Sequence, residues 1–323
     1  MKRRRFIAAG TGLAAGITSA APFTLGASDV QRLQDDLGNL LRLDDQNGGG
    51  PELERRAVSL SDHAVSLQTT GRATTRIRSR LYSLAASFRA LALWAAIDSR
   101  RLDQAGRHME TAVTLAGLSR DGLVQHQVWR FASSLAIQRG NWIEATAANE
   151  AAALTSVHRR DPLYASLTNA RLAVTLAKQE PARARRALDR AELAFGRADL
   201  AAHRPVAMEF YTRSELDGLL GVAHLHLGEP EAAEARFHRS IAGLRPEQHR
   251  NRAYYTVHAA QAQLRQRDIE QACATAATVI PPPWSTESGR IPHMLGGFTK
   301  QLRVTAPDAS ITREWLHQIR AAD

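Results

Sequence analysis

Histidine is the residue type in this sequence with the clearest capacity for chemistry, because imidazole both binds metal ions and exchanges protons near neutral pH. The chain has 12 histidines, and a single residue separates His224 from His226. In a helix this spacing directs the two side chains to different faces, so they cannot share a metal ion. His108, His126 and His158 have no carboxylate at ligand spacing, and no His-Glu-x-x-His motif occurs. The sequence therefore predicts no metal site.

Motifs of nucleophilic catalysis and of phosphate binding are also missing. No serine stands in a Gly-x-Ser-x-Gly elbow, and the three glycines at 48–50 lack the Lys-Ser/Thr pair of a phosphate-binding loop. The single cysteine, Cys273, excludes an internal disulfide and a cysteine metal cluster, and its place in a predicted helix is typical of a small core residue. We therefore expect a protein that is not an enzyme and that uses no cofactor.

The net charge of +10 raises the question of nucleic-acid binding. Lys2 and the three arginines that follow it account for four units of this net charge. The other basic residues are almost all arginine and are spread along segments that also carry many Asp and Glu residues. An arginine bias of this kind is what a GC-rich genome produces. We therefore expect no direct binding of nucleic acid by this chain.

The elements that must position any functional residue are helices. The composition is rich in alanine and only 6% aromatic, which suits close helix packing better than sheets. Apolar residues recur at helical spacing over 29–45, a glycine-rich turn follows, and the pattern is helical from Pro51 to the prolines at 281–283. The sequence thus predicts an all-α chain in four parts: a signal or linker (1–28), a helix with a glycine-rich turn (29–50), a repeat region (51–280) and C-terminal capping helices (281–323).

One stretch, LLGVAHLHLGEPEAAEARFHRSI at 219–241, has the pattern of a tetratricopeptide repeat, a hairpin of two packed helices. Leu220 and Gly221 occupy the Leu-Gly position of that pattern, and Gly228 occupies the turn. Ala233 stands where the two helices cross closely, and Phe237 stands at the bulky site that meets the next unit. All five residue types agree with the packing that such a hairpin requires.

Weaker copies of this stretch place small crossing residues at Ala105, Ala145, Ala184 and Ala272. Together with Ala233, these alanines are separated by 40, 39, 49 and 39 residues, which is longer than the roughly 34 residues of a standard unit. We therefore expect long helices, and a loop inserted near 196–212 where the spacing is 49. The predicted architecture is a right-handed superhelix of about five to six tetratricopeptide-like helix pairs.

The segments LALWAAIDSRRLDQAGRHMETAVTLA, FYTRSELDGLLGVAHLHLGEPEAAEARF and RAYYTVHAAQAQLRQRDIEQACATA carry a wider likeness. Over roughly residues 29–320 the chain resembles the repeat region of actinobacterial helix-turn-helix transcriptional regulators of the xenobiotic-response-element type. In that family the repeats follow a DNA-binding domain and a basic linker, sense a peptide or small molecule, and dimerise. The resemblance implies a regulatory module that binds a peptide, a small molecule or a protein partner, with a homodimer as a further expectation.

No helix-turn-helix precedes Lys2 in this sequence, which leaves three interpretations open. The first is a binding module in its own right, and the second is a fragment of a DNA-binding regulator whose N-terminal domain is missing from the gene model. The third comes from Arg3, Arg4 and Phe6, which match a twin-arginine export signal and precede an uncharged run up to Ser28. We prefer a cytoplasmic linker to a signal for export. The glycines in this run make it too weakly hydrophobic for a stable membrane span.

A superhelix of hairpins binds ligands on its concave face, which the first helix of each pair lines. The offsets of the strongest copy place a mixture of amides, arginines and aromatic residues there, a set suited to an extended peptide. Three aromatic residues, Trp129, Trp142 and Phe195, are predicted to pack between repeats instead. The predicted concave-face residues are Trp94, Asp98, Gln127, Arg130, Ser134, Gln138, Asn169, Glu215, His226, Tyr254, Gln261 and Arg265.

Overall fold

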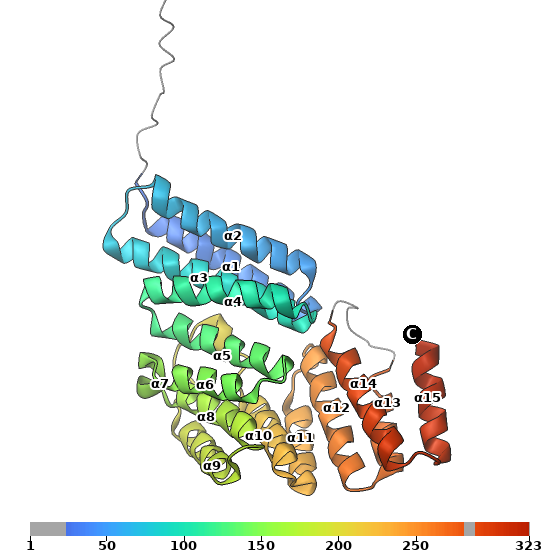
Figure 1. Ribbon diagram of the computed structural model, residues 1–323. Coiled ribbons are helices and arrows are strands. Elements are labelled where there is room, and N and C mark those ends of the chain that lie inside the picture. The colour runs from blue at the N-terminus through green and yellow to red at the C-terminus, as the bar shows by residue number, and fades with distance from the viewer. Residues whose placement is uncertain (1–23, 281–287, 323) are drawn as a thin grey trace, which may run out of the picture.

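The computed structural model describes residues 24–280 and 288–322, and this part of the chain is helical throughout (Figure 1). It contains 15 α-helices and one short 3-10 helix, and its one β-type pairing is an isolated bridge between Thr24 and Arg72. The all-α prediction is therefore confirmed. The proposed export residues Arg3, Arg4 and Phe6 lie outside the described residues, so the interpretation of the N-terminus stays a prediction.

Helices that follow one another in the chain pack as pairs, after an N-terminal layer of α1 (Ala27–Asn47) and α2 (Pro51–Thr70) that packs on α3. The five pairs are α3 (Thr75–Asp98) with α4 (Leu102–Ser119), α5 (Gly122–Gln138) with α6 (Trp142–Ala153), α8 (Pro162–Leu176) with α9 (Pro181–Arg197), α10 (Arg213–Leu227) with α11 (Pro230–Gly243), and α12 (His249–Arg265) with α13 (Ile269–Ala277). The remaining elements are α7 (Ser156–Arg160), η1 (Val206–Met208), α14 (Arg290–Thr305) and α15 (Ser310–Ala322).

The sequence sets the helix boundaries through proline and capping residues. Pro181 and Pro230 stand in the first turn of α9 and α11, where the missing amide N–H costs nothing. The side chains of Asp121 and Asp161 cap α5 and α8, each accepting a hydrogen bond at 2.9 Å from the amide two residues on. Gly228 ends α10 with φ 79°, a left-handed conformation that favours glycine.

The helix pairs meet at the small residues that the repeat pattern indicated. The crossing alanines Ala105, Ala145, Ala184, Ala233 and Ala272 are all 0% exposed. In the strongest copy, a Cβ added at Gly221 would lie 2.6 Å from the Phe237 ring, so this crossing requires a glycine. These positions pack as the sequence predicted.

The extra length of the repeats is distributed unevenly. It lies in long helices for α3 and α4, with 24 and 18 residues, as expected. In contrast, α6 has only 12 residues, and the short helix α7 follows it. The expected loop near 196–212 begins after the last turn of α9, contains η1 and touches α1, so it crosses the inner side of the helix stack.

The two ends of the helix stack meet. The Gly289 amide, just before α14, donates a hydrogen bond of 3.0 Å to the Asp98 carbonyl at the end of α3. The tail forms two helices, as predicted, and Trp315 of α15 is 1% exposed in a core with residues of α12, α13 and α14. In the part of the chain that is described, no helix is both long and apolar enough to cross a membrane.

Candidate functional site

A cavity of about 320 Å³ lies on the inner side of the helix stack, a size within the range of small-molecule sites. Its walls come from the first helix of every pair, namely α3, α5, α8, α10 and α12. Two helices from opposite ends of the helix stack, α1 and α14, complete the walls. The inserted segment around η1 closes one side with Val206, Ala207 and Phe210. This arrangement agrees with the prediction that the first helices of the pairs line the inner face.

Most of the residues predicted for the concave face come together around this cavity. Asp98, by contrast, is fully buried behind the wall, and Asn169 bonds within its own helix and to Arg190. Gln261 hydrogen-bonds to His258, and Arg265 donates to the Leu225 carbonyl, so neither lines the cavity. These four predictions were wrong because the residue offsets of the strongest repeat were applied to every helix, although each helix is rotated differently about its own axis. The predicted residues that do line the cavity are Trp94, Gln127, Arg130, Ser134, Gln138, Glu215, His226 and Tyr254.

Trp142 is a correction to the sequence analysis. It was expected to pack between repeats, but it lines the cavity as the first residue of α6. Its ring meets His226 edge-on at 5.2 Å, and the Lys178 ammonium lies 4.3 Å from the ring centre. Phe195 is buried in the core as expected, whereas Trp129 is only partly buried.

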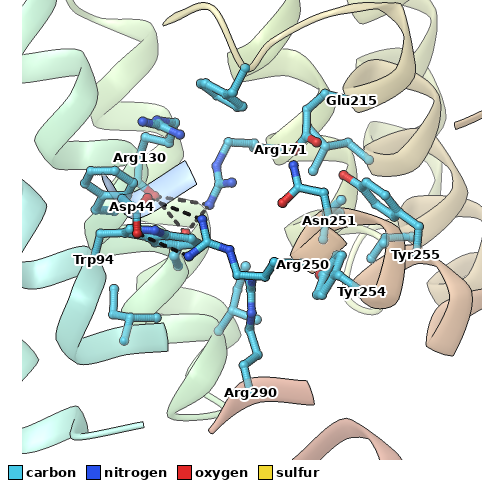
Figure 2. Close-up of a pocket in the computed structure, with 18 of the residues that line it drawn as sticks. Asp44, Trp94, Arg130, Arg171, Glu215, Arg250, Asn251, Tyr254, Tyr255 and Arg290 are labelled. Carbon is cyan, nitrogen blue, oxygen red and sulfur yellow. Dashed lines mark hydrogen bonds and ion pairs between the residues drawn. The ribbon is translucent and has the colours of Figure 1, made fainter. Parts of the chain in front are cut away.

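Two arginines from neighbouring pairs dominate the inner wall of the cavity (Figure 2). The Arg130 guanidinium lies 4.3 Å from the Phe131 ring centre and 4.5 Å from that of Phe210. Arg171 donates hydrogen bonds to the Arg130 carbonyl at 3.1 Å and to Ser134 Oγ at 2.8 Å. Its Nε is buried and has no hydrogen-bond partner among the described residues. Neither guanidinium forms an ion pair with a carboxylate in this part of the chain.

The cavity disfavours the charge of both arginines. Burial, and then the charge of Arg171, lower the pKa of Arg130 to about 9. Burial also lowers the pKa of Arg171. The charge of Glu215 favours both cations but offsets the effect of burial only in part, and a bound anion would offset more of it. The chemistry of the pair is suited to binding an anion.

One carboxylate, Glu215, faces the same space from α10. Its Oε2 is buried without a hydrogen-bond partner among the described residues, and burial raises the pKa of this carboxyl. The charges of Arg171 and Arg130 and the Tyr255 hydroxyl offset that effect only in part. Asn251 and Tyr255 of α12 lie near it and give the cavity polar groups that could bind a ligand (Figure 2).

A buried ionic cluster, which we call the closing cluster, joins the two ends of the stack at the rim of the cavity. It consists of Asp44 of α1, Asp98 of α3, Arg250 of α12 and Arg290 of α14. Arg250 Nη1 lies 3.2 Å from a carboxylate oxygen of Asp44 and 3.2 Å from one of Asp98, and Arg290 Nε lies 3.4 Å from Asp98. Burial opposes the charge of Arg250, but the two carboxylates outweigh it and raise its pKa above the usual range.

The described lining of the cavity offers groups for recognition, namely guanidiniums, aromatic rings and amides. No cluster of three or more His, Cys, Asp or Glu side chains able to hold a metal occurs in residues 24–280 and 288–322. Burial, as the largest cause, lowers the pKa of His226 to about 4 and that of His258 to about 3, so both imidazoles are neutral near pH 7. The arrangement has the groups to bind an anion and to stack a ring.

Several cavity residues escaped the sequence analysis, among them Arg171, Phe210, Arg250 and Arg290. For Arg171 a signal existed, because it is the only charged residue in the otherwise apolar or neutral helix α8. Phe210 belongs to the inserted segment, where no helical period assigns a face. Arg250 and Arg290 reach the site only because the two ends of the stack meet, which no local pattern encodes. Comparison with known proteins gives no match, either to a protein-family model or to a curated protein.

Proposed function

We propose that this chain is a non-catalytic binding module that takes its ligand into the cavity on the inner side of the helix stack. The single observation that carries the proposal is a cavity lined by two partly buried guanidiniums, Arg130 and Arg171, that form no ion pair among the described residues. Native proteins rarely keep buried charged groups unpaired unless those groups serve a function.

The architecture we propose is a right-handed superhelix of tetratricopeptide-like pairs, in which the first helices form the inner face. Support comes from the buried alanines at the five predicted crossings and from a cavity wall made of α3, α5, α8, α10 and α12. A ligand in this cavity touches helices of all five pairs at once. Its binding would therefore stabilise one relative arrangement of the pairs, which is how a sensor module reports its ligand.

The proposed role is regulatory, as the resemblance to the sensor region of helix-turn-helix regulators implies. The closing cluster favours a small molecule, or the end of a peptide, over a long extended peptide, because it joins α1 and α3 to α12 and α14 across the cavity. A cavity of about 320 Å³ also suits a compact ligand. The proposal includes a partner protein or a second copy of the chain that binds the ligand-bound form.

The test exposes the purified full chain to a protein-free extract of small molecules from its host, and identifies what it retains by mass spectrometry. The variant Asn251→Trp fills the cavity, because Asn251 points into it (Figure 2). The variant Gln318→Trp, on the exposed side of α15, is the matched control. We expect a compound retained by the wild type and the control and lost from Asn251→Trp. Equal retention by all three proteins, or by none, contradicts the proposal.

A further inference from the structure

The charged groups that face the cavity do not balance. In the closing cluster two carboxylates meet two guanidiniums, so its charges cancel. Among the other lining residues, Arg245 and Glu209 lie on the exposed rim, where water screens them. Inside remain Arg130, Arg171 and Glu215, of which two are cationic and one is anionic. The interior of the described site therefore carries an excess of one positive charge when all three are ionised.

The positive charge lies in one place. Arg171 Nη2 donates a hydrogen bond of 3.1 Å to the backbone carbonyl of Arg130, and this bond holds the Arg171 guanidinium close to Arg130. The charge of each arginine is disfavoured by burial, and Arg171 further lowers the pKa of Arg130. Guanidiniums bind oxyanions through charge-assisted hydrogen bonds. Arg171 Nη2 already donates both of its hydrogens to Arg130 and Ser134, so the Nε and Nη1 of Arg171 and the guanidinium of Arg130 remain as donors.

Aromatic rings flank these guanidiniums on the side of α3 and of the inserted segment. Trp94 stacks on Phe131 with ring centres 5.3 Å apart, and Phe210 covers Arg130 from the other side. The opposite wall holds Tyr254, Tyr255 and Glu215 (Figure 2). A ligand that places an anionic group on the arginines must therefore place its body among flat apolar surfaces, and its far end near a hydrogen-bond acceptor.

From this arrangement we infer that the ligand is a compact organic anion, a carboxylate or phosphate ester on an aromatic or apolar body. Its oxyanion binds to Arg130 and Arg171, and a hydroxyl or amino group at the far end can donate to Glu215. The inference rests on the proposed function and gives its ligand a chemical class. It also predicts that neutral compounds of the same shape bind poorly, since they leave both guanidiniums unpaired.

The experiment titrates the full chain by calorimetry with three probes: 3-phenylpropionate, its neutral amide 3-phenylpropionamide, and phenyl phosphate. We expect the carboxylate to bind at least about tenfold more tightly than the amide, because the amide cannot pair with the guanidiniums. The affinity for phenyl phosphate distinguishes a phosphate ester from a carboxylate as the class of the ligand. If it binds more tightly than the carboxylate, the ligand is a phosphate ester, and if it binds less tightly, the ligand is a carboxylate.

Two variants link the preference to the arginines. Arg130→Gln and Arg171→Gln should each weaken binding of the carboxylate by about tenfold to a hundredfold and leave the weak binding of the amide unchanged. Arg130→Lys keeps a positive charge and should retain part of the preference. Arg130→Gln should change the melting temperature little, because it removes both a charge that burial disfavours and the contacts of that charge with Phe131 and Phe210. A merely structural role for Arg130 would instead lower it and leave the acid–amide ratio unchanged.

Each outcome separates this inference from the proposed function. Acid and amide of equal affinity, both lost in Asn251→Trp, would overturn the anion assignment and leave the binding cavity intact. Carboxylate binding that survives in Asn251→Trp would place the anion elsewhere and overturn the inference. Failure of all three probes would also overturn it, whereas the host-extract experiment decides the proposed function independently.

Discussion

At the scale of single residues, the cavity is distinguished by charge that the described protein does not neutralise. Arg130 and Glu215 stand among the residues that sequence periodicity assigned to the inner face, and the structure places both in the cavity wall. The sequence could indicate the helix face on which these two side chains lie, because each is the one charged residue on an otherwise uncharged face of its helix. It could not indicate that they lack partners, since that depends on side chains from helices distant in the chain.

The Glu215 carboxyl predicts a pH dependence of stability. Burial raises its folded-state pKa above the unfolded value, so its contribution is fully present below the unfolded pKa and is lost as the pH rises through the folded one. The groups that face it are Arg171, Arg130, Tyr255 and Arg290. We therefore expect Glu215→Gln to increase the free energy of unfolding near pH 8, and to do so less near pH 4.

Urea denaturation of wild type and Glu215→Gln across this pH range measures the difference between them, in which the other titrating groups cancel. A variant that is destabilised at every pH would show that the ionised carboxylate is paired in the folded protein, contrary to this account.

At the scale of elements, local patterns predicted the helix pairs but not how each pair faces the cavity. The crossing alanines and Gly221 could be found from spacing alone, because close contact of two backbones permits only small side chains. The rotation of each helix is set by its own neighbours. Asn169 was therefore expected on the inner face, although Arg171 occupies it. The inserted segment has no period, and its contribution of Phe210 could not be predicted.

A matched pair of substitutions on α11 tests the crossing. Ala233 is fully buried where α10 and α11 meet, whereas Ala235 on the same helix is exposed. Ala233→Leu should overpack the crossing and lower the free energy of unfolding by about 1–3 kcal/mol, while Ala235→Leu should change it by less than about 0.5 kcal/mol. Thermal and urea denaturation measure both. Equal losses in the two variants would refute the crossing assigned to Ala233.

The inserted segment should depend on one ion pair. Arg204 Nε and Nη2 lie 2.7 Å and 2.9 Å from the two carboxylate oxygens of Asp161, the residue that caps α8. Arg204→Ala should increase amide hydrogen exchange over residues 203–211 and speed ligand release, because this segment forms one wall of the cavity. Arg185→Ala removes an exposed pair with Glu229 and is the control. Unchanged exchange over 203–211 would contradict this role of Arg204.

At the scale of the whole molecule, the closing cluster joins residues more than 200 positions apart in the sequence, since Arg250 and Asp44 are 206 residues apart. No local pattern could predict that contact, because it depends on how all the helix pairs between α1 and α12 pack on one another. It joins the two ends of the inner face that the repeat pattern predicted, so the cavity there is partly enclosed. Because the cavity walls shield Arg130 and Arg171 from water, leaving these arginines without an ion pair costs free energy, and this cost indicates a binding role.

Removing Arg250 should open the molecule. Arg250→Met leaves Asp44 and Asp98 buried with less compensation, so we expect a loss of about 3–5 kcal/mol in the free energy of unfolding. We also expect a larger radius of gyration in X-ray scattering, because α1 and α3 lose their link to α12. Adding Asp44→Asn should recover part of the stability. If the single variant keeps both the stability and the radius of gyration of the wild type, the cluster does not close the stack.

The most direct test of ligand binding in this cavity is an NMR titration of the tryptophan indole N–H signals with 3-phenylpropionate. Trp94 and Trp142 line the cavity, whereas Trp315 is buried in the C-terminal core and serves as an internal reference. We predict that the Trp94 and Trp142 signals shift in a saturable way and that the Trp315 signal stays in place. Saturable shifts of Trp315 or Trp129, with Trp94 and Trp142 unchanged, would place the ligand outside the cavity and contradict the account.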